Sequence, residues 1–169
     1  MPSRVTDLDA QDTLTAVDRM SRDTTTLVMT LALAPGLTAH HPAVIRTSIE
    51  AATLTMDQPV PAADLPGPVN VPGLQGWVIA QRGVAVAGAW SYLHGTDCGV
   101  YTVETVTEWR RQGLAAALMR HMLADAWDRG ARTATLQSTR MGRPLYEALG
   151  FTAAGRYEEW VRSLAALTT

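Results

Sequence analysis

The stretch TVTEWRRQGLAAALMR, residues 105–120, runs from β-branched residues through two arginines and a glycine into a helical sequence. A strand that passes into a helix through such a turn leaves main-chain N–H groups without a helical acceptor. Arg110 and Arg111 add positive charge beside these groups, and Gly113 and Ala115 are too small to cover them. The pattern is typical of a site for a phosphate or pyrophosphate.

Taken alone, two arginines and a glycine before a helix also occur on ordinary protein surfaces. The stretch lacks the lysine-containing pattern of a P-loop, and it lacks the full set of glycines of a dinucleotide-binding turn. Whether the stretch is a surface feature or an anion site therefore depends on the secondary structure predicted around it.

Residues 76 to 106 carry apolar runs of strand length that are separated by short polar connections. The connections at Arg82-Gly83 and at 94–98 are short enough for hairpins. The sequence therefore predicts three strands, at 76–83, 84–93 and 99–106.

After the opening stretch, apolar residues at helical spacing continue to Gly130, which is expected to end the helix. The elements predicted next are a strand at 131–138, a short helix at 143–149 and a strand or hairpin at 151–163. A helical crossover should make the strand at 131–138 parallel to the one before it. The order β-β-β-α-β-α-β predicts a mixed sheet with helices on its faces.

The first part of the chain is less regular. It predicts a helix from Leu8 to Arg22, a strand at 24–33 and a helix at 41–56. Residues 58–76 contain five of the nine prolines, which excludes a regular helix or a central strand there. We interpret this segment as a functional loop within one domain rather than as a domain boundary.

The composition is that of a globular protein. The chain has 169 residues, 47% of them hydrophobic, and a formal net charge of -2, which gives no electrostatic reason to expect a nucleic acid or a membrane as partner. Cys98 is the only cysteine, so neither a disulfide framework nor a zinc-thiolate cluster is expected. The start of the sequence has no apolar signal-peptide core, and no apolar run is long enough to span a membrane. A cytoplasmic protein is the expectation.

Two motifs in the right order resemble the GNAT superfamily of acetyl-CoA-dependent N-acetyltransferases. The stretch VETVTEWRRQGLAAALM, residues 103–119, resembles the family's strand–loop–helix cofactor motif. The stretch GRPLYEALGF, residues 142–151, resembles its second motif, a short helix with a tyrosine. The sequence departs from the family where it has Thr107 instead of the frequent proline, Arg111 instead of the frequent glycine, and Ser138-Thr139 instead of the frequent asparagine.

The resemblance implies an α/β fold of the α+β type. Its central sheet would be mixed, mostly antiparallel and flanked by helices, with a splay between the strands near 99–106 and 131–138. Residues 1–169 would form one domain, made of a variable part at 1–75 and a cofactor-binding core at 76–163.

The resemblance also implies acetyl-CoA as acyl donor, bound without a metal. Its pantetheine arm would lie in the splay and bond to the backbone of Val103 and Thr105, while the turn at 111–116 would hold the pyrophosphate. The residues implied in donor binding are Val103, Thr105, Arg110, Arg111, Gln112, Gly113, Leu114, Ala115, Ala116, Ser138 and Tyr146.

Attack of an amine on a thioester needs a group to take the amine proton and an acid for the departing thiolate. Tyr146, at the family's tyrosine position, is the expected acid, because a phenol is protonated at neutral pH. Glu104 is the candidate base, although a solvated or salt-bridged glutamate is the alternative. The weaker candidates for the base are His94, Asp97, Glu158, Glu159 and a relay through water.

Other residue types allow alternatives. Cys98 could carry an acetyl group, but a lone cysteine at the start of a strand is more often a small buried residue. Trp90, Tyr92 and Trp109 could line an acceptor pocket, although tryptophans in strands are usually part of the core.

The function predicted from these residues is transfer of an acetyl group to a primary amine, more readily that of a small molecule than of a nucleic acid or a basic protein. A cofactor-binding module without turnover is the alternative from another class, and transfer of a longer acyl chain is a third option. A homodimer is a further expectation by analogy with the family.

Overall fold

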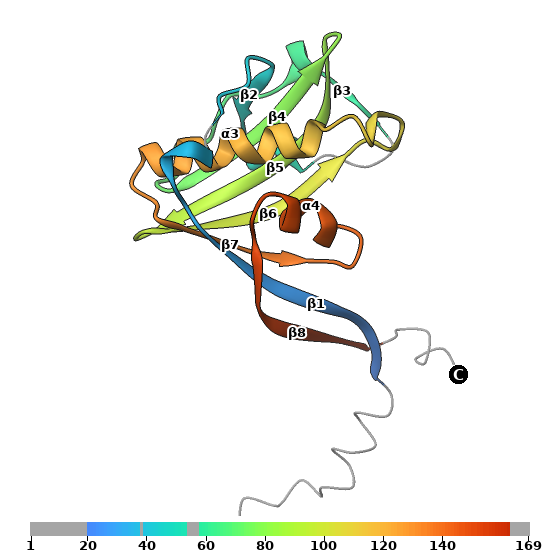
Figure 1. Ribbon diagram of the computed structural model, residues 1–169. Coiled ribbons are helices and arrows are strands. Elements are labelled where there is room, and N and C mark those ends of the chain that lie inside the picture. Colours follow the sequence, from blue (N-terminus) through green and yellow to red (C-terminus); the bar gives the residue numbers. More distant parts are fainter. Residues whose placement is uncertain (1–19, 38, 54–57, 163–169) are drawn as a thin grey trace, which may run out of the picture.

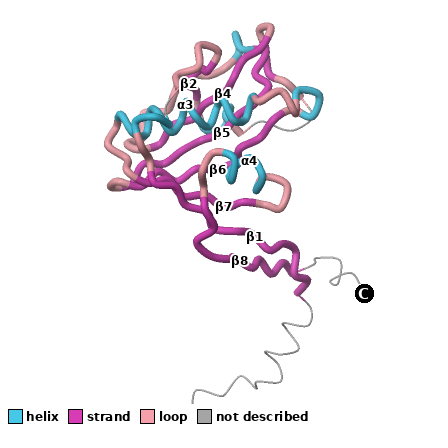
Figure 2. The backbone as a smooth tube through the Cα atoms, viewed as in Figure 1, coloured by secondary structure: helices cyan, strands magenta, loops and turns pink. Residues whose placement is uncertain are grey.

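The computed structural model describes residues 20–37, 39–53 and 58–162. Figures 1 and 2 show a strongly twisted sheet with helices against it. The strands are β1 Met20–Ala32, β2 Val44–Thr47, β3 Val60–Pro61, β4 Leu74–Gln81, β5 Val84–His94, β6 Asp97–Thr105, β7 Thr133–Ser138 and β8 Thr152–Arg162. The helices are α2 Ile49–Ala52, α3 Leu114–Asp128 and α4 Arg143–Ala148, with 3₁₀ turns η1 Pro35–Leu37, η2 Ala62–Asp64 and η3 Thr107–Trp109.

In this part of the chain the strands form a sheet in the order β2-β4-β5-β6-β7-β1-β8, and β3 pairs with β5. The pairs are antiparallel except for β6 with β7, which the crossover through α3 makes parallel. The mixed, mostly antiparallel sheet predicted from the sequence is confirmed.

The two predicted hairpins are present because their turn residues take left-handed conformations. Arg82 and Gly83 have φ of 51° and 81°, as a type I′ turn between β4 and β5 requires. His94 pairs with Asp97 across the next hairpin, and Gly95 takes a φ of 58° within its loop. These two turns bring β4, β5 and β6 side by side.

The apolar side of α3 forms the centre of the core. Its residues Leu118, Met119 and Met122 are fully buried against the sheet, as the helical spacing predicted. Replacement of a fully buried leucine by alanine costs about 3 kcal/mol, so Leu118 is a major contributor to stability. Tyr146 of α4 belongs to the same core cluster, which places α4 on the same face as α3 (Figure 1).

The opposite face of the sheet carries a smaller cluster under α2. Ala52, Val78 and Ala85 are fully buried there, and Trp90 packs against them. Of the helices described, none is long and apolar enough to cross a bilayer.

The sequence did not predict where the first strand lies. β1 lies between β7 and β8, so the strand nearest the N-terminus is inserted among the last strands of the chain (Figure 1). It pairs with β7 only over Leu27–Ala32 but with β8 from Met20 to Thr30. β1 and β8 therefore continue past β7 as a two-stranded arm (Figure 2).

The helix predicted at 41–56 is confirmed only over Ile49–Ala52 and is wrong for the residues before it. Val44–Thr47 form the edge strand β2, and Ser48 then caps the short α2 by accepting from the Ala51 amide at 3.3 Å. The β-branched residues of VIRT explain the strand, and a serine that bonds the following amides explains where the helix begins. Residues 54–57 lie outside the described part of the chain.

The helix predicted from Leu8 to Arg22 lies mostly outside the described residues, and its last three residues already belong to β1. The loop predicted at 58–76 is largely irregular, with β3 and η2 inside it and the first residues of β4 at its end. The last element, predicted as a strand or a hairpin, is the single strand β8.

The predicted splay opens between β6 and β7. Their pairing runs from Asp97 with Thr133 to Val100 with Leu136 and then stops, while β6 continues to Thr105. In the separated part of β6, Thr102 takes a φ of 46°, and the register against β5 shifts as in a β-bulge. One edge of β6 is thus left open toward α4.

Candidate active site

A cleft of about 1130 Å³ occupies the splay. Its walls come from β6, from the turn before α3, and from the segment between β7 and α4. Leu136, which packs in the core below α3, lines the cleft together with Thr135 and Gln137, whose side chains point to the opposite face of the sheet. The cleft therefore passes between the two strands and is lined from both faces.

The turn before α3 ends the cleft with main-chain donors. Gly113 caps the helix in a left-handed conformation with a φ of 76°, and Arg111 also has a positive φ of 63°. The first helical bond is donated by the Ala117 amide to the Gly113 carbonyl, 3.0 Å away. The amides of Leu114, Ala115 and Ala116 consequently have no acceptor within the helix.

Space is left beside Gly113, at the start of these amides. A Cβ built on Gly113 meets no atom within 4 Å, so nothing in the described structure covers this point of the turn. The two arginines add charge at the same end, and Arg110 Nε donates to the Thr105 carbonyl at 3.1 Å. Open amides, a helix N-terminus and positive side chains together fit a phosphate group.

The edge of β6 supplies further backbone groups. The Val106 amide donates to Val86 of β5, so alternate residues Val103 and Thr105 direct their backbone groups away from β5 and into the cleft. An amide-containing chain in the cleft could bond to them like an added strand.

Glu104 and Tyr146 line the same cleft from two different elements. Burial raises the pKa of the Glu104 carboxyl above its ordinary value, and the nearby Arg110 partly opposes this. Burial, and then the charge of Glu104, raise the pKa of the Tyr146 phenol to about 12. The cleft therefore holds a carboxylate that is a stronger base than usual and a phenol that is protonated at neutral pH.

The position of Tyr146 depends on its neighbours in α4. Pro144 lies in the first turn of the helix, and the Tyr146 ring centroid lies 6.0 Å from that of Phe151. A Cβ built on Gly142 would lie only 3.0 Å from the ring, so a glycine there leaves room for the tyrosine. With these neighbours the Tyr146 side chain lines the cleft opposite β6.

The structure places most of the sequence-predicted donor residues along the cleft and two of them outside its lining. The residues that line it are Val103, Thr105, Arg110, Arg111, Gly113, Leu114, Ala115, Ala116 and Tyr146. Gln112 is exposed and lies outside the lining. Ser138 is buried and donates to the Thr139 carbonyl at 2.9 Å, and it is Thr139 that lines the cleft.

The weaker candidates lie elsewhere. His94 is exposed on a hairpin, and Asp97 accepts hydrogen bonds from Thr133 and Thr135, each at 2.6 Å. The Cys98 thiol is fully buried, and burial raises its pKa to about 11, which disfavours the thiolate that a nucleophile needs. The side chains of Glu158 and Glu159 lie outside the described structure.

Of the three aromatic residues proposed for an acceptor pocket, one lines the cleft and two do not. Trp109 lines the cleft, with the Arg82 guanidinium 5.9 Å from its ring, whereas Trp90 and Tyr92 do not line it. Sequence reasoning missed Tyr101, which lines the cleft beside the bulge. The alternation of strand residues could have placed it on the face opposite Val100, but nothing in the sequence signals the bulge.

One cleft in the splay thus brings together open helix amides, a carboxylate and a phenol. Residues 72–153 match the family model of the acetyltransferase (GNAT) domain. This part of the chain belongs to the GNAT superfamily, as the two sequence motifs indicated.

Solved structures show the same fold. A putative GNAT acetyltransferase from Novosphingobium aromaticivorans is similar with a TM-score of 0.64 and 24% identity, over 85% of this chain and 67% of that one. A GCN5-related N-acetyltransferase from Kribbella flavida is similar with a TM-score of 0.61 and 21% identity, over 87% and 62%. One from Sphaerobacter thermophilus has a TM-score of 0.57 and 16% identity, over 92% and 58%.

The chain thus spans between 58% and 67% of the length of these three structures. No curated protein matches its sequence.

Proposed function

We propose that this chain transfers an acetyl group from acetyl-CoA to the primary amine of a small molecule, by direct attack within a ternary complex. The observation that carries this proposal is the presence of open helix amides at one end of a cleft that also holds Glu104 and Tyr146. The pyrophosphate, the pantetheine arm and the thioester of the donor each have a matching part of the cleft.

The anion site before α3 fits the pyrophosphate of the donor. Leu114, Ala115 and Ala116 offer amides, and Arg110 and Arg111 add charge without a metal. The backbone groups of Val103 and Thr105 face the space in which the amides of a pantetheine arm would lie. An arm that follows β6 away from the turn brings its thioester toward Glu104 and Tyr146.

The chemistry then requires alignment and two proton movements. The amine nitrogen forms a bond to the acetyl carbon, and the bond between that carbon and sulfur breaks. One proton leaves nitrogen for Glu104, directly or through water. Another proton passes from the Tyr146 hydroxyl to the departing thiolate, and water restores it.

The pKa shifts have the direction that these roles need. A carboxylate with a raised pKa accepts a proton more readily near neutral pH. A phenol with a pKa near 12 stays protonated until a thiolate draws its proton away. The formal net charge of -2 gives the chain no electrostatic attraction to a nucleic acid, which favours a small amine as acceptor.

Two measurements test the proposal. Calorimetry with coenzyme A should show binding, and it should weaken when Arg111 is replaced, but not when the Gln112 side chain is removed by Gln112→Ala. Release of free thiol from acetyl-CoA should then depend on an added amine. Binding without thiol release for any amine would favour a non-catalytic acyl-CoA module, and no binding would reject the donor site altogether.

The length of the acyl group is tested in the same assay. A series from acetyl-CoA to longer acyl-CoA thioesters should show the highest kcat/KM for acetyl. A maximum at a longer chain would retain the transferase and change its donor.

A further inference from the structure

An aromatic ring forms part of the cleft wall on the α2 side of the sheet. Tyr101 is 43% exposed and stacks on Trp90, with ring centroids 4.1 Å apart and an angle of 15° between the planes. The ring lies along β6, because a Cβ built on Gly99 would be 2.6 Å from its hydroxyl oxygen. Trp90 thus supports one face of the ring, and Gly99 leaves room for its hydroxyl end.

The lining residues that β7 and β1 contribute beside this ring are neutral. Thr135 and Gln137 project from β7 on the same side of the sheet, and Val28 of β1 lines the cleft next to them. Thr135 Oγ1 donates to Asp97 Oδ2 at 2.6 Å, so a carboxylate lies just behind this wall.

Charge is distributed unequally along the cleft. Among its described lining residues the cationic side chains are Arg110 and Arg111, and both belong to the turn before α3. Glu104 lies between that turn and Tyr101 in the sequence and lines the cleft. Among the described lining residues, an acceptor on the Tyr101 side would meet the negative charge of Glu104, with Asp97 behind Thr135, but no cationic partner for a carboxylate.

We infer that the acceptor is an arylalkylamine without a carboxylate, with its ring against Tyr101 and its amine toward Glu104. This inference rests on the proposed function and names the substrate class for the same cleft. The donor reaches the reaction point from the α3 side and the acceptor from the α2 side, since the cleft is lined from both faces. The acetyl carbon gains a bond to nitrogen and loses its bond to sulfur, as in the proposed reaction.

Tyramine and tyrosine give the sharpest test, because they differ only in the α-carboxylate. In the thiol-release assay kcat/KM for tyramine should exceed that for tyrosine by about 50-fold or more, since the carboxylate would be desolvated without a partner. Ethanolamine, which lacks a ring, should be about 10-fold less efficient than tyramine. Spermidine should also be a poor acceptor.

Tyr101 and Tyr92 provide a matched pair of variants. They lie on neighbouring strands and are 43% and 40% exposed, but Tyr92 is outside the lining of the cleft. Tyr101→Ala should raise KM for tyramine about 10-fold without changing KM for acetyl-CoA, whereas Tyr92→Ala should change neither. Tyr101→Phe keeps the ring and should restore KM for tyramine, which separates stacking from a general loss of structure.

A cation added at the neutral wall should change the preference. Gln137→Arg should raise kcat/KM for tyrosine relative to tyramine by about 10-fold, because the guanidinium can pair with the carboxylate.

The outcomes distinguish this inference from the proposed function. The acceptor class is overturned if kcat/KM for tyrosine, ethanolamine or spermidine equals that for tyramine. Thiol release with these amines would still support the transferase. An unchanged KM for tyramine in Tyr101→Ala overturns the role of the ring. No thiol release with any amine overturns the proposed function and this inference with it.

Discussion

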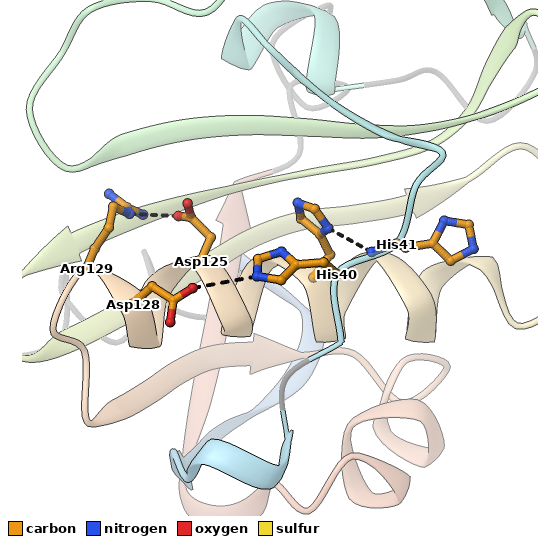
Figure 3. Close-up of polar contacts among 6 residues, drawn as sticks. His40, His41, Asp125, Asp128 and Arg129 are labelled. Carbon is orange, nitrogen blue, oxygen red and sulfur yellow. Dashed lines mark hydrogen bonds and ion pairs between the residues drawn. The ribbon is translucent and has the colours of Figure 1, made fainter.

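The main-chain amide of His41 donates a hydrogen bond to Nδ1 of His121, 3.1 Å away, and so joins the segment before β2 to the middle of α3. Figure 3 shows His40 and His41 beside the helix, with His40 directed at Asp128. The His121 ring also packs edge-to-face with the rings of His40 and Trp77, at centroid distances of 5.2 and 5.0 Å. A ring nitrogen that accepts this bond carries no proton.

The free energy of unfolding should therefore fall as the pH falls below about 6.5. Burial, and then the neighbouring His40, lower the pKa of His121 below its ordinary 6.5, and the opposing charge of Asp125 only partly compensates. The unfolded chain then binds the proton more readily, so acid favours unfolding. Urea denaturation between pH 7.5 and 5.5 would measure this slope.

His121→Gln is the informative variant, because an amide oxygen can accept from His41 without titrating. It should reduce the dependence of the free energy of unfolding on pH. An unchanged slope in His121→Gln would show that another group causes the acid sensitivity.

Arg111→Gly should raise the free energy of unfolding by about 0.5 kcal/mol, because glycine adopts the positive φ of 63° without the steric cost that arginine carries. The same change should weaken binding of coenzyme A several-fold, more at low salt than at high salt, because a charge near the phosphates is lost. Arg111→Ala is the matched control, since it removes the charge but keeps the side-chain cost at this φ. Thermal unfolding and calorimetry on both variants separate the two effects, and equal stability of the two variants would contradict the conformational part.

The stretch at 105–120 could be interpreted from sequence because its signals are local. A turn whose amides remain open depends on residues within one helical turn of Gly113, and the hairpin at Arg82-Gly83 depends on its own two residues. Glu104 and Tyr146 are distant in sequence, and the resemblance to a family, not a local pattern, brought them to one site.

The features that the sequence did not predict share a physical cause, which is strand pairing between distant segments. The place of β1 between β7 and β8 depends on partners more than 100 residues away, and no periodicity in β1 encodes it. The bulge at Thr102 arises from the register of β6 against β5, and it is this register that sets Tyr101 on the cleft wall. The strand β2 was mistaken for a helix because a β-branched run only becomes a strand once β4 lies beside it.

Glu104→Gln should lower kcat and slightly stabilise the fold. Burial raises the pKa of this carboxyl in the folded protein, so the folded state binds the proton more readily than the unfolded state. The negative charge of Glu104 therefore opposes folding above that pKa, and the uncharged glutamine removes this destabilisation. Because solvent screens the charge, we expect Tm to rise by only about 1 °C at pH 7. The stabilisation should vanish at acid pH, where the wild-type carboxyl is protonated. Wild-type kcat with a raised stability would reject the role of Glu104 as base.

Tyr146→Phe should lower kcat by about 100-fold or more while KM for acetyl-CoA and the Tm stay close to wild type. Tyr146 is only 7% exposed and its ring packs on Phe151, so phenylalanine keeps the packing and removes the hydroxyl alone. Steady-state kinetics with acetyl-CoA and with a thioester that has a more acidic leaving thiol make the test specific. A better leaving group needs less protonation, so the deficit of the variant should shrink for that donor. A deficit that is equal for both donors would mean that the hydroxyl positions the thioester rather than protonating the sulfur.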